Sequence, residues 1–574
     1  MEDYTRNRRG LLIALIAVAI AALLYLIAIL IALPIFQNSR LTDPLAEIHS
    51  LFPLYYIAIG IMAVVCFGCV VYALGNSRLH ISLLGLFGLM LWFTPYYLAG
   101  FTMVRDGPWR IGVSMRISEV LAGNVDAFSV GTASYPISFI YHYSFVNITG
   151  VEPLTYTGII FPLISILLFI LLGYTLISRI LGDRVAFLAM LLGIPGLHYV
   201  LFHPSPRTVG LLLMMTTLLL LTRPGVAPKV MAVVIFPAIL LSHAISPIIL
   251  VIFIVAAVFA NYFFGGSKRQ LVVTGAILAV GFAGWLLLNF EDISGSLLGL
   301  FSGDLWERAR FWPENLFAPQ FIYSGIYYLN IGVYGLFAAG AIATVGYVAA
   351  RAYAEERSIK NWLRRVFRLN RGEAIMVFSV ILLSVATLML ASRSTTFIER
   401  GLTFIILALS CLIASVILRS TGLKIGKRIG LSVLILLLVL TLSFPVVAYS
   451  IHAYDSFPPS EQAGLEFTAE HIPLEGKAVA TTNLPQLTLF TDPPPEKLRF
   501  IQYILFPDPT VLIEKQPDII IFRSTAYFNA AMRWDLSFEE NRFITYRAMV
   551  DDDSQYHRVY SSPTFEIYTV RPSQ

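Results

Sequence analysis

The chain has 574 residues, of which 57% are hydrophobic and only 13% are charged, and its mean hydropathy is +0.75. Soluble domains carry about a quarter charged residues and rarely contain apolar stretches of about 20 residues. The composition therefore excludes an ordinary soluble protein. The formal net charge of +5 is small for this length, and the Lys and Arg residues lie in short loops, so nucleic acid is not an expected partner.

The first apolar run, 11–35, follows a basic flank, as the hydrophobic region of a signal peptide does. This run is about twice the length of such a region, and no small-residue cleavage site follows it. The sequence therefore predicts an uncleaved first transmembrane helix.

Apolar runs bounded by charged or turn-forming residues recur almost to residue 450, which predicts an α-helical polytopic membrane protein with about thirteen transmembrane helices. As one helix, 230–264 would overshoot a bilayer core of about 30 Å, and its central SHAISP segment predicts a short turn. The candidate spans are 11–35, 51–74, 81–104, 153–178, 185–202, 208–222, 230–242, 246–264, 271–289, 331–350, 374–391, 401–418 and 429–450.

The distribution of Lys and Arg predicts which loops are cytoplasmic. With the N-terminus inside, the inside segments hold 21 of the 40 Lys and Arg residues, seven of them in 351–373. The outside loops, which are longer, hold nine. We therefore expect a multi-pass protein of the cell (plasma) membrane with a cytoplasmic N-terminus and an extracytoplasmic C-terminal region.

The second span contains the sequence CFGC, with Cys66 and Cys69. A redox or metal site would need polar and accessible surroundings, so two packed cysteines in a membrane helix are the expected structure.

The outer loop 105–152 begins with a cluster of charges in the stretch RDGPWRIGVSMRISEVLAGNVD. Asp106 and Pro108 are suited to the start of a helix, and Gly123 to its end. Apolar residues fall on one stripe of that helix, at Trp109, Val113, Ile117, Val120 and Leu121. Such a helix is suited to lying in the membrane interface, with Asp106 at the outer boundary.

The predicted domains are a transmembrane domain, 1–450, and a small extracytoplasmic α/β domain, 451–574. In the second, SEQAGLEFTAEHIP predicts a helix, KAVATT and DIIIFR predict short strands, and HRVYSSPTFEIYTV predicts two strands around a turn. The acidic triplet 551–553 is expected to be a solvated turn, since no nucleotide-binding βαβ unit precedes it.

The predicted spans carry almost no charge at mid-depth, which argues against ion-coupled transport. Charged residues and histidines from distant parts of the chain instead gather at the outer edge of the membrane. A site there would suit an amphiphile whose head group lies at that interface. The residues are Asp43, Glu47, Arg105, Asp106, Arg110, His203, Arg207, His243, Arg393 and Arg400.

In four short motifs the chain resembles the GT-C superfamily of polytopic glycosyltransferases, especially the archaeal and bacterial enzymes that use dolichyl- or polyprenyl-phosphate sugars. The motifs are RDGPWRIGVSMRISEVLAG after an early span, ASYPISFIYH before the next, the outer turns FHPSPR and LLSHAISP, and SEQAGLEFTAEHIP. The resemblance implies a GT-C-like fold and transfer of a sugar from a polyprenyl-phosphate carrier. The acceptor would be a glycan, a lipid or a protein.

The resemblance also implies that Asp106 is the acidic residue at the acceptor and that an outer Arg such as Arg400 holds the donor phosphate. The chemistry agrees, since a carboxylate must take the acceptor's proton or hold a divalent cation, and cations must stabilise the leaving phosphate. Glu47 and Asp43 are alternative carboxylates. The alternative phosphate ligands are Arg393, Arg207 and Arg105, and the further outer-face candidates are His203, His243 and Arg110.

The sequence departs from the family pattern in three places. Relatives often have His where this chain has Arg110, and their acid normally follows the first helix, which favours Asp43 or Glu47. The tail lacks the Trp-Trp-Asp-Tyr-Gly motif of oligosaccharyltransferases, which argues against protein N-glycosylation. The alternative function is therefore a non-catalytic membrane protein that binds a lipid-linked glycan or a partner.

Overall fold

The computed structural model describes most of the predicted spans and parts of the outer loops and tail. The described residues are 2–39, 50–51, 53–99, 111–112, 114–115, 117, 136–197, 202, 204–243, 245–264, 269–288, 371–391, 395–420, 427–453, 459–471, 478–480, 518–523, 547–553, 555–562 and 565–570.

Twelve of the thirteen predicted spans coincide with described helices, and the remaining one, 331–350, lies outside the described residues. The membrane helices are α1 (Glu2–Ser39), α3 (Pro53–Val71), α4 (Ser77–Gly88) continuing through η1 (Leu89–Phe93) into α5 (Thr94–Ala99), α10 (Pro153–Thr155) continuing through η3 (Tyr156–Ile160) into α11 (Phe161–Leu181), α12 (Asp183–Gly196), α13 (Pro206–Thr222), α14 (Ala227–Leu240), α15 (Ile245–Phe264), α16 (Arg269–Leu288), α22 (Arg371–Ala391), α23 (Thr395–Ser420) and α24 (Lys427–Ala453). The predicted turn within 230–264 is confirmed between α14 and α15.

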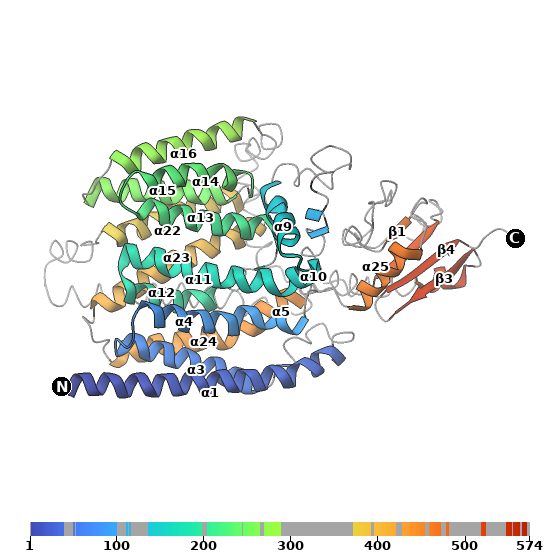
Figure 1. Ribbon diagram of the computed structural model, residues 1–574, viewed down its shortest axis with the longest axis horizontal. Coiled ribbons are helices and arrows are strands. Elements are labelled where there is room, and N and C mark those ends of the chain that lie inside the picture. Colours follow the sequence, from blue (N-terminus) through green and yellow to red (C-terminus); the bar gives the residue numbers. More distant parts are fainter. Residues whose placement is uncertain are drawn as a thin grey trace.

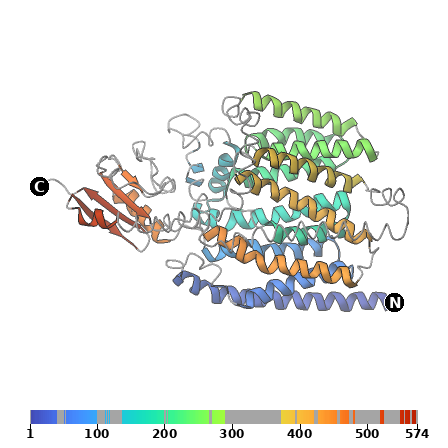
Figure 2. The ribbon, with the colours of Figure 1, turned by 180° about the vertical axis from the view of Figure 1, so that it is seen from behind.

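The helices run side by side along the long axis of the molecule, and the N-terminus and the C-terminal strands lie at opposite ends (Figure 1). The view from behind shows the same arrangement (Figure 2). We call the end toward the strands the outer end and the other the inner end. Helix α9 (Pro136–Thr149) lies across the bundle axis at the outer end.

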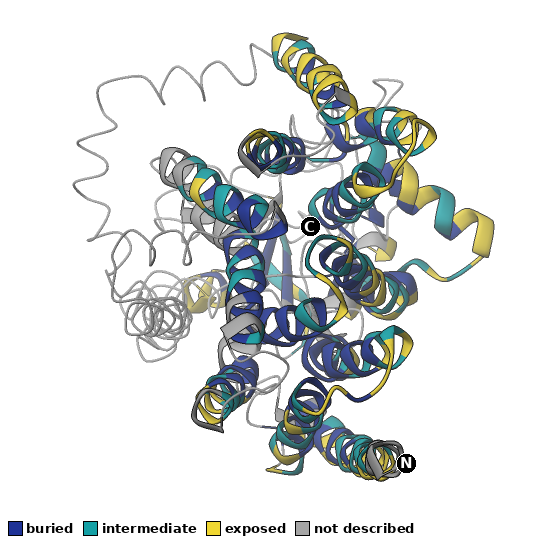
Figure 3. Cartoon of the chain, turned by 90° about the vertical axis from the view of Figure 1, so that its left-hand side faces the viewer, coloured by how far each residue is buried: buried dark blue, intermediate teal, exposed yellow. Residues whose placement is uncertain are grey.

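Helix α12 is the centre of the bundle. Every residue from Ala186 to Leu197 is buried, and α12 packs against α4, α11, α23 and α24. At the periphery of the bundle, α1 and α16 bury few of their apolar side chains (Figure 3). Such surfaces are stable only against lipid.

In the described part of the chain, six helices have the length and apolar composition needed to cross a membrane, and five shorter apolar helices accompany them. The predicted fold class, an α-helical polytopic membrane protein with a small C-terminal α/β region, is therefore confirmed. The buried positions of Cys66 and Cys69 in α3 agree with the packing expected for them.

Two membrane helices contain a π-helical turn, and each turn ends two residues before a proline. Segment η1 ends at Phe93 before Pro95, and η3 ends at Ile160 before Pro162. Proline has no N–H to donate and its ring crowds the preceding turn, so the helix widens there. The outer ends of the two bent helices are in contact, through α5 and η3.

The C-terminal region has the predicted elements: α25 (Pro459–His471), β1 (Ala478–Ala480), β2 (Ile519–Arg523), β3 (Tyr556–Ser561) and β4 (Phe565–Val570). The sheet order is β1-β2-β4-β3, with β1 and β2 parallel and the other pairs antiparallel. Helix α25 packs on β3 and β4. The acidic residues 551–553 are exposed as expected, but Asp551 and Asp552 belong to the end of a helix rather than to a turn, and Asp551 accepts a hydrogen bond from the Tyr568 hydroxyl at 2.8 Å. The domain boundary at 450 stays a prediction.

Candidate functional site

The structure places three of the predicted site residues. Arg207 lies at the start of α13, His243 lies in the turn between α14 and α15, and Arg400 is the sixth residue of α23. The other predicted residues lie outside the described part of the chain: Asp43, Glu47, Arg105, Asp106, Arg110, His203 and Arg393.

The start of α13 is fixed by local sequence. Ser205 is the N-cap, and its Oγ accepts a hydrogen bond from the Thr208 N–H at 3.2 Å. Pro206 follows at the first helical position, where its missing N–H costs nothing. Arg207 is therefore held in the first turn, half-buried, at the outer end of the bundle.

The turn that carries His243 packs closely on α13 at Gly210. A Cβ placed on Gly210 would lie 2.7 Å from Ser246 Oγ and 2.9 Å from His243 Cβ. The His243 ring is oriented by Ser246, with 3.2 Å between Nδ1 and Oγ. Arg207 lies one helical turn before Gly210 on α13, so the turn of His243 packs on α13 close to Arg207 along the chain.

A third element, α5, reaches the same place. The Tyr96 hydroxyl is buried beside the Phe202 backbone, within electrostatic range of the Arg207 guanidinium, and it makes no hydrogen bond of good geometry. The Trp92 ring packs one turn earlier against Phe202, with 5.0 Å between ring centroids. Tyr96 was not among the residues predicted from the sequence, because only the bend in this span turns it toward Arg207.

The outer loop packs beside these residues. The described residues 111, 112, 114, 115 and 117 are helical, and Ile117 is buried, in agreement with the predicted helix. Ile111 forms a small apolar cluster with Val209 of α13 and with Tyr156 and Phe161. The outer loop is thereby joined directly to the helix that carries Arg207.

Helix α9 was not predicted, although Pro136 at its start and the helical spacing of Phe139, His142 and Val146 could have indicated it. These three residues are buried, and His142 Nδ1 lies 2.8 Å from the Tyr156 hydroxyl. Burial raises the pKa of the neighbouring Tyr141, so its phenol is neutral at physiological pH. The Ile137 N–H donates to the Leu241 carbonyl at 3.2 Å, which ties α9 to the turn before His243.

The described residues include no group of three or more His, Cys, Asp and Glu side chains that could hold a metal ion. They do bring together a guanidinium, an imidazole and hydroxyls at one end of a membrane bundle. Such groups bind and neutralise an anion, above all a phosphate at the membrane surface.

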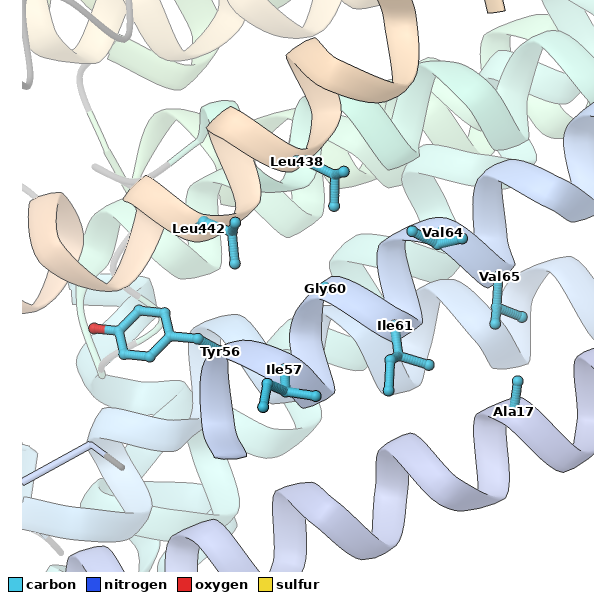
Figure 4. A pocket seen from close by; sticks show the side chains of 9 residues that line it. All are labelled: Ala17, Tyr56, Ile57, Gly60, Ile61, Val64, Val65, Leu438 and Leu442. Carbon is cyan, nitrogen blue, oxygen red and sulfur yellow. The ribbon is translucent and has the colours of Figure 1, made fainter. Parts of the chain in front are cut away.

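An apolar groove of about 510 Å³ lies away from these residues, between α1, α3 and α24. Figure 4 shows its lining side chains, which are hydrocarbon apart from the Tyr56 phenol: Ala17, Tyr56, Ile57, Gly60, Ile61, Val64, Val65, Leu438 and Leu442. This groove offers no acid or cation for group-transfer chemistry.

The fold defines a multi-pass membrane protein, with Arg207, His243 and Tyr96 at one end of its helical bundle. No family model and no curated protein matches the sequence. Among solved structures, the chain is similar to the crystal structure of ArnT from Cupriavidus metallidurans bound to undecaprenyl phosphate, with a TM-score of 0.46 and 12% identity. The match covers 86% of this chain and 99% of that one. It is a modest similarity of overall fold.

Proposed function

We propose that this protein is an integral-membrane glycosyltransferase that moves a sugar from a polyprenyl-phosphate carrier to an acceptor at the extracytoplasmic face. One observation carries the proposal: the turn that holds His243 packs on α13 one helical turn after Arg207, at the outer end of the bundle. The Tyr96 hydroxyl of a third element, α5, is buried within electrostatic range of the Arg207 guanidinium. A lipid phosphate would meet these groups from the membrane while its sugar faced the outer loop.

The reaction would be a displacement at the anomeric carbon. The Asp106 carboxylate takes the proton of the acceptor hydroxyl, whose oxygen attacks the anomeric carbon. The bond from that carbon to the phosphate oxygen breaks, and the lipid phosphate leaves with the electron pair. Arg207, together with Arg400, Arg393 or Arg105, stabilises the charge on that phosphate. Asp43 and Glu47 are the alternative bases.

The proposal includes the sidedness of the chain. The basic segments at the inner ends of the helices would be cytoplasmic, and the C-terminal sheet would be extracytoplasmic, in a cell membrane. The lipid donor and bulk membrane lipids would be the partners, and the acceptor would be a glycan, a lipid or a protein. A divalent cation at the outer carboxylates remains part of the proposal.

Native mass spectrometry of the purified protein tests the donor class. We expect the wild type to retain an added undecaprenyl phosphate, and Arg207→Ala to lose it while Arg207→Lys keeps part of it, because a charge is preserved. Arg400→Ala, measured alongside, decides whether that residue shares the phosphate. The proposal would be contradicted if the wild type and all variants retained bulk phospholipid to the same extent and none of them preferred the polyprenyl phosphate.

The alternative, a non-catalytic protein that binds a lipid-linked glycan, is favoured by Arg110 in the place where the resembling family often has His. Retention of the lipid-linked sugar without turnover, in the presence of candidate acceptors, would support this alternative.

A further inference from the structure

The span Ser77–Ala99 is not a continuous α-helix, and its π turn η1 lies just before the residues that reach the candidate site. A π turn accommodates one residue more than an α-helical turn, so it rotates everything after it by about 100° around the helix axis. In this structure Tyr96 is buried toward Phe202, while the next residue, Tyr97, is 44% exposed. The π turn therefore decides which of the two tyrosines is buried beside Phe202.

Because of Pro95, this π turn needs hydrogen-bond donors from side chains. In a π turn the N–H of residue 95 would bond to the carbonyl of Met90, five residues earlier, and in an α-helix to that of Leu91. Proline has no N–H, so neither carbonyl receives this bond. A membrane interior offers no water to replace the missing donor, and an unsatisfied carbonyl there is costly.

Two side-chain hydroxyls supply the missing donors to Met90. The Tyr55 hydroxyl of α3 donates to the Met90 carbonyl at 2.8 Å, and Thr94 Oγ1 donates to the same oxygen at 2.6 Å. A carbonyl oxygen accepts two hydrogen bonds, so its capacity is filled. Tyr55, Met90 and Thr94 are each fully buried.

The network continues to α1. The Tyr25 hydroxyl lies 2.9 Å from Thr94 Oγ1. Since the single proton of Thr94 is used on Met90, Tyr25 must be the donor in this bond. Three membrane elements are thus joined: α3 bonds to the Met90 carbonyl of the bent span, and α1 bonds to the Thr94 hydroxyl of the same span.

We infer that Tyr55, Thr94 and Tyr25 are positioning residues for the candidate site. Tyr55 and Thr94 complete the hydrogen bonds of Met90, and Tyr25 holds the Thr94 hydroxyl. Together they stabilise η1, and so they fix where α5 lies beside Phe202. They also fix the position of Ala99, the last residue of α5, which precedes Asp106 by seven residues in the sequence. Only the expected effect on sugar transfer rests on the proposed function. The hydrogen bonds that position α5 do not depend on what the protein does.

Distance measurements between spin labels test the geometry directly. One label on α5 (Tyr97→Cys) and one at the end of α9 (Ile148→Cys, 84% exposed) report how α5 lies relative to α9, which packs against α13. The native cysteines Cys66, Cys69 and Cys411 are buried. We expect Tyr55→Phe and the double variant Tyr55→Phe/Thr94→Val to shift or broaden this distance distribution.

Two matched controls separate this effect from the loss of any tyrosine hydroxyl. Tyr56→Phe removes the neighbouring phenol, which lines the apolar groove. Tyr174→Phe removes a buried hydroxyl that lies 3.2 Å from His80 Nδ1, at the inner end of the same span. We expect both controls to leave the Tyr97–Ile148 distribution unchanged.

A transfer assay provides the second readout. Tyr55→Phe should lower kcat by about tenfold and leave the KM for the lipid donor unchanged, because α13 and its contact with His243 are not altered. If the Tyr55 variants shift the distance but the wild type transfers no sugar, the role of these residues in positioning α5 stands and the proposed function is overturned. If the wild type is active and both Tyr55 variants keep the wild-type distance and kcat, the positioning inference is overturned and the proposed function stands.

Discussion

Asp183, at the inner end of the bundle, is held in its charged form by neighbouring hydroxyls. Its carboxylate accepts a hydrogen bond from Ser77 Oγ at 2.6 Å and another from Ser178 Oγ. These bonds, Ser178 first, lower the pKa of Asp183 below its usual value. Because the pKa is lower in the folded state, this stabilisation is complete above the usual value, about 3.8, and is lost as the pH falls through the folded pKa.

The variant Ser77→Ala/Ser178→Ala should therefore unfold at a lower temperature than the wild type at pH 7. The difference should shrink as the pH falls below about 4, where the wild type loses the same bonds. Thermal unfolding in detergent across pH measures this, with Thr175→Val as the control, since its hydroxyl bonds only to the Leu171 carbonyl of its own helix. A difference independent of pH would contradict the assignment.

The proposed base gives a second prediction at this scale. Asp106→Asn should lower sugar transfer by a factor of at least about 10² without changing lipid retention, because an amide takes no proton. Asp43→Asn and Glu47→Gln, in the same assay, test the alternative bases. Full activity of Asp106→Asn with loss in either of the other variants would move the base to the first outer loop.

Among the elements, the contact between α13 and α15 is the tightest part of the candidate site. Gly210→Ala would place a Cβ 2.7 Å from Ser246 Oγ and 2.9 Å from His243 Cβ. We expect this substitution to destabilise the protein by about 1–3 kcal/mol, and to weaken lipid retention, because the two elements must separate. Gly68→Ala is the matched control, since a Cβ there meets nothing within 4 Å.

The double variant Gly210→Ala/Ser246→Ala should recover part of the lost stability, because it removes the nearer of the two contacts. Thermal unfolding of the three proteins measures the recovery. If Gly210→Ala unfolds at the wild-type temperature, the close approach of α13 and α15 is not present.

The spans and strands could be predicted because their signals are local. A long apolar run with a charged boundary is sufficient for a membrane helix, and twelve described helices coincide with such runs. The π turn η1 could not be predicted in the same way. Pro95 indicates a disturbed helix, but only the hydroxyl of Tyr55, from another span, decides how the helix is completed. The place of Tyr96 in the candidate site is unpredictable for the same reason.

Arg207 and His243 could be predicted in part. Their residue types and outer position could be predicted from the sequence. Their adjacency depends on Gly210, which lies within an apolar run and has no distinguishing feature in the sequence. The catalytic role of Asp106 and the phosphate-binding role of Arg400 stay predictions.

For the whole molecule, the opposite positions of the N-terminus and the C-terminal strands give a test of sidedness. Cysteines introduced at Ile148 and Asp552 should react with an impermeant maleimide on intact cells. A cysteine at Val226, which is 63% exposed at the inner end, should react only after the membrane is opened. Labelling of Val226→Cys in intact cells would reverse the proposed orientation.

The burial of α12 has a consequence for how the protein is made. Its 14 residues span only about 21 Å, less than a bilayer core, and its Gly193 face is covered by Ser410 of α23. At 5–20 residues per second, α23 leaves the ribosome on the order of 10–40 s after α12. Throughout that interval α12 has its earlier neighbours α4 and α11 but lacks the cover of α23 and α24, and it is too short to span the bilayer alone. The nascent chain must therefore be sheltered by the insertion machinery until its last third is translated.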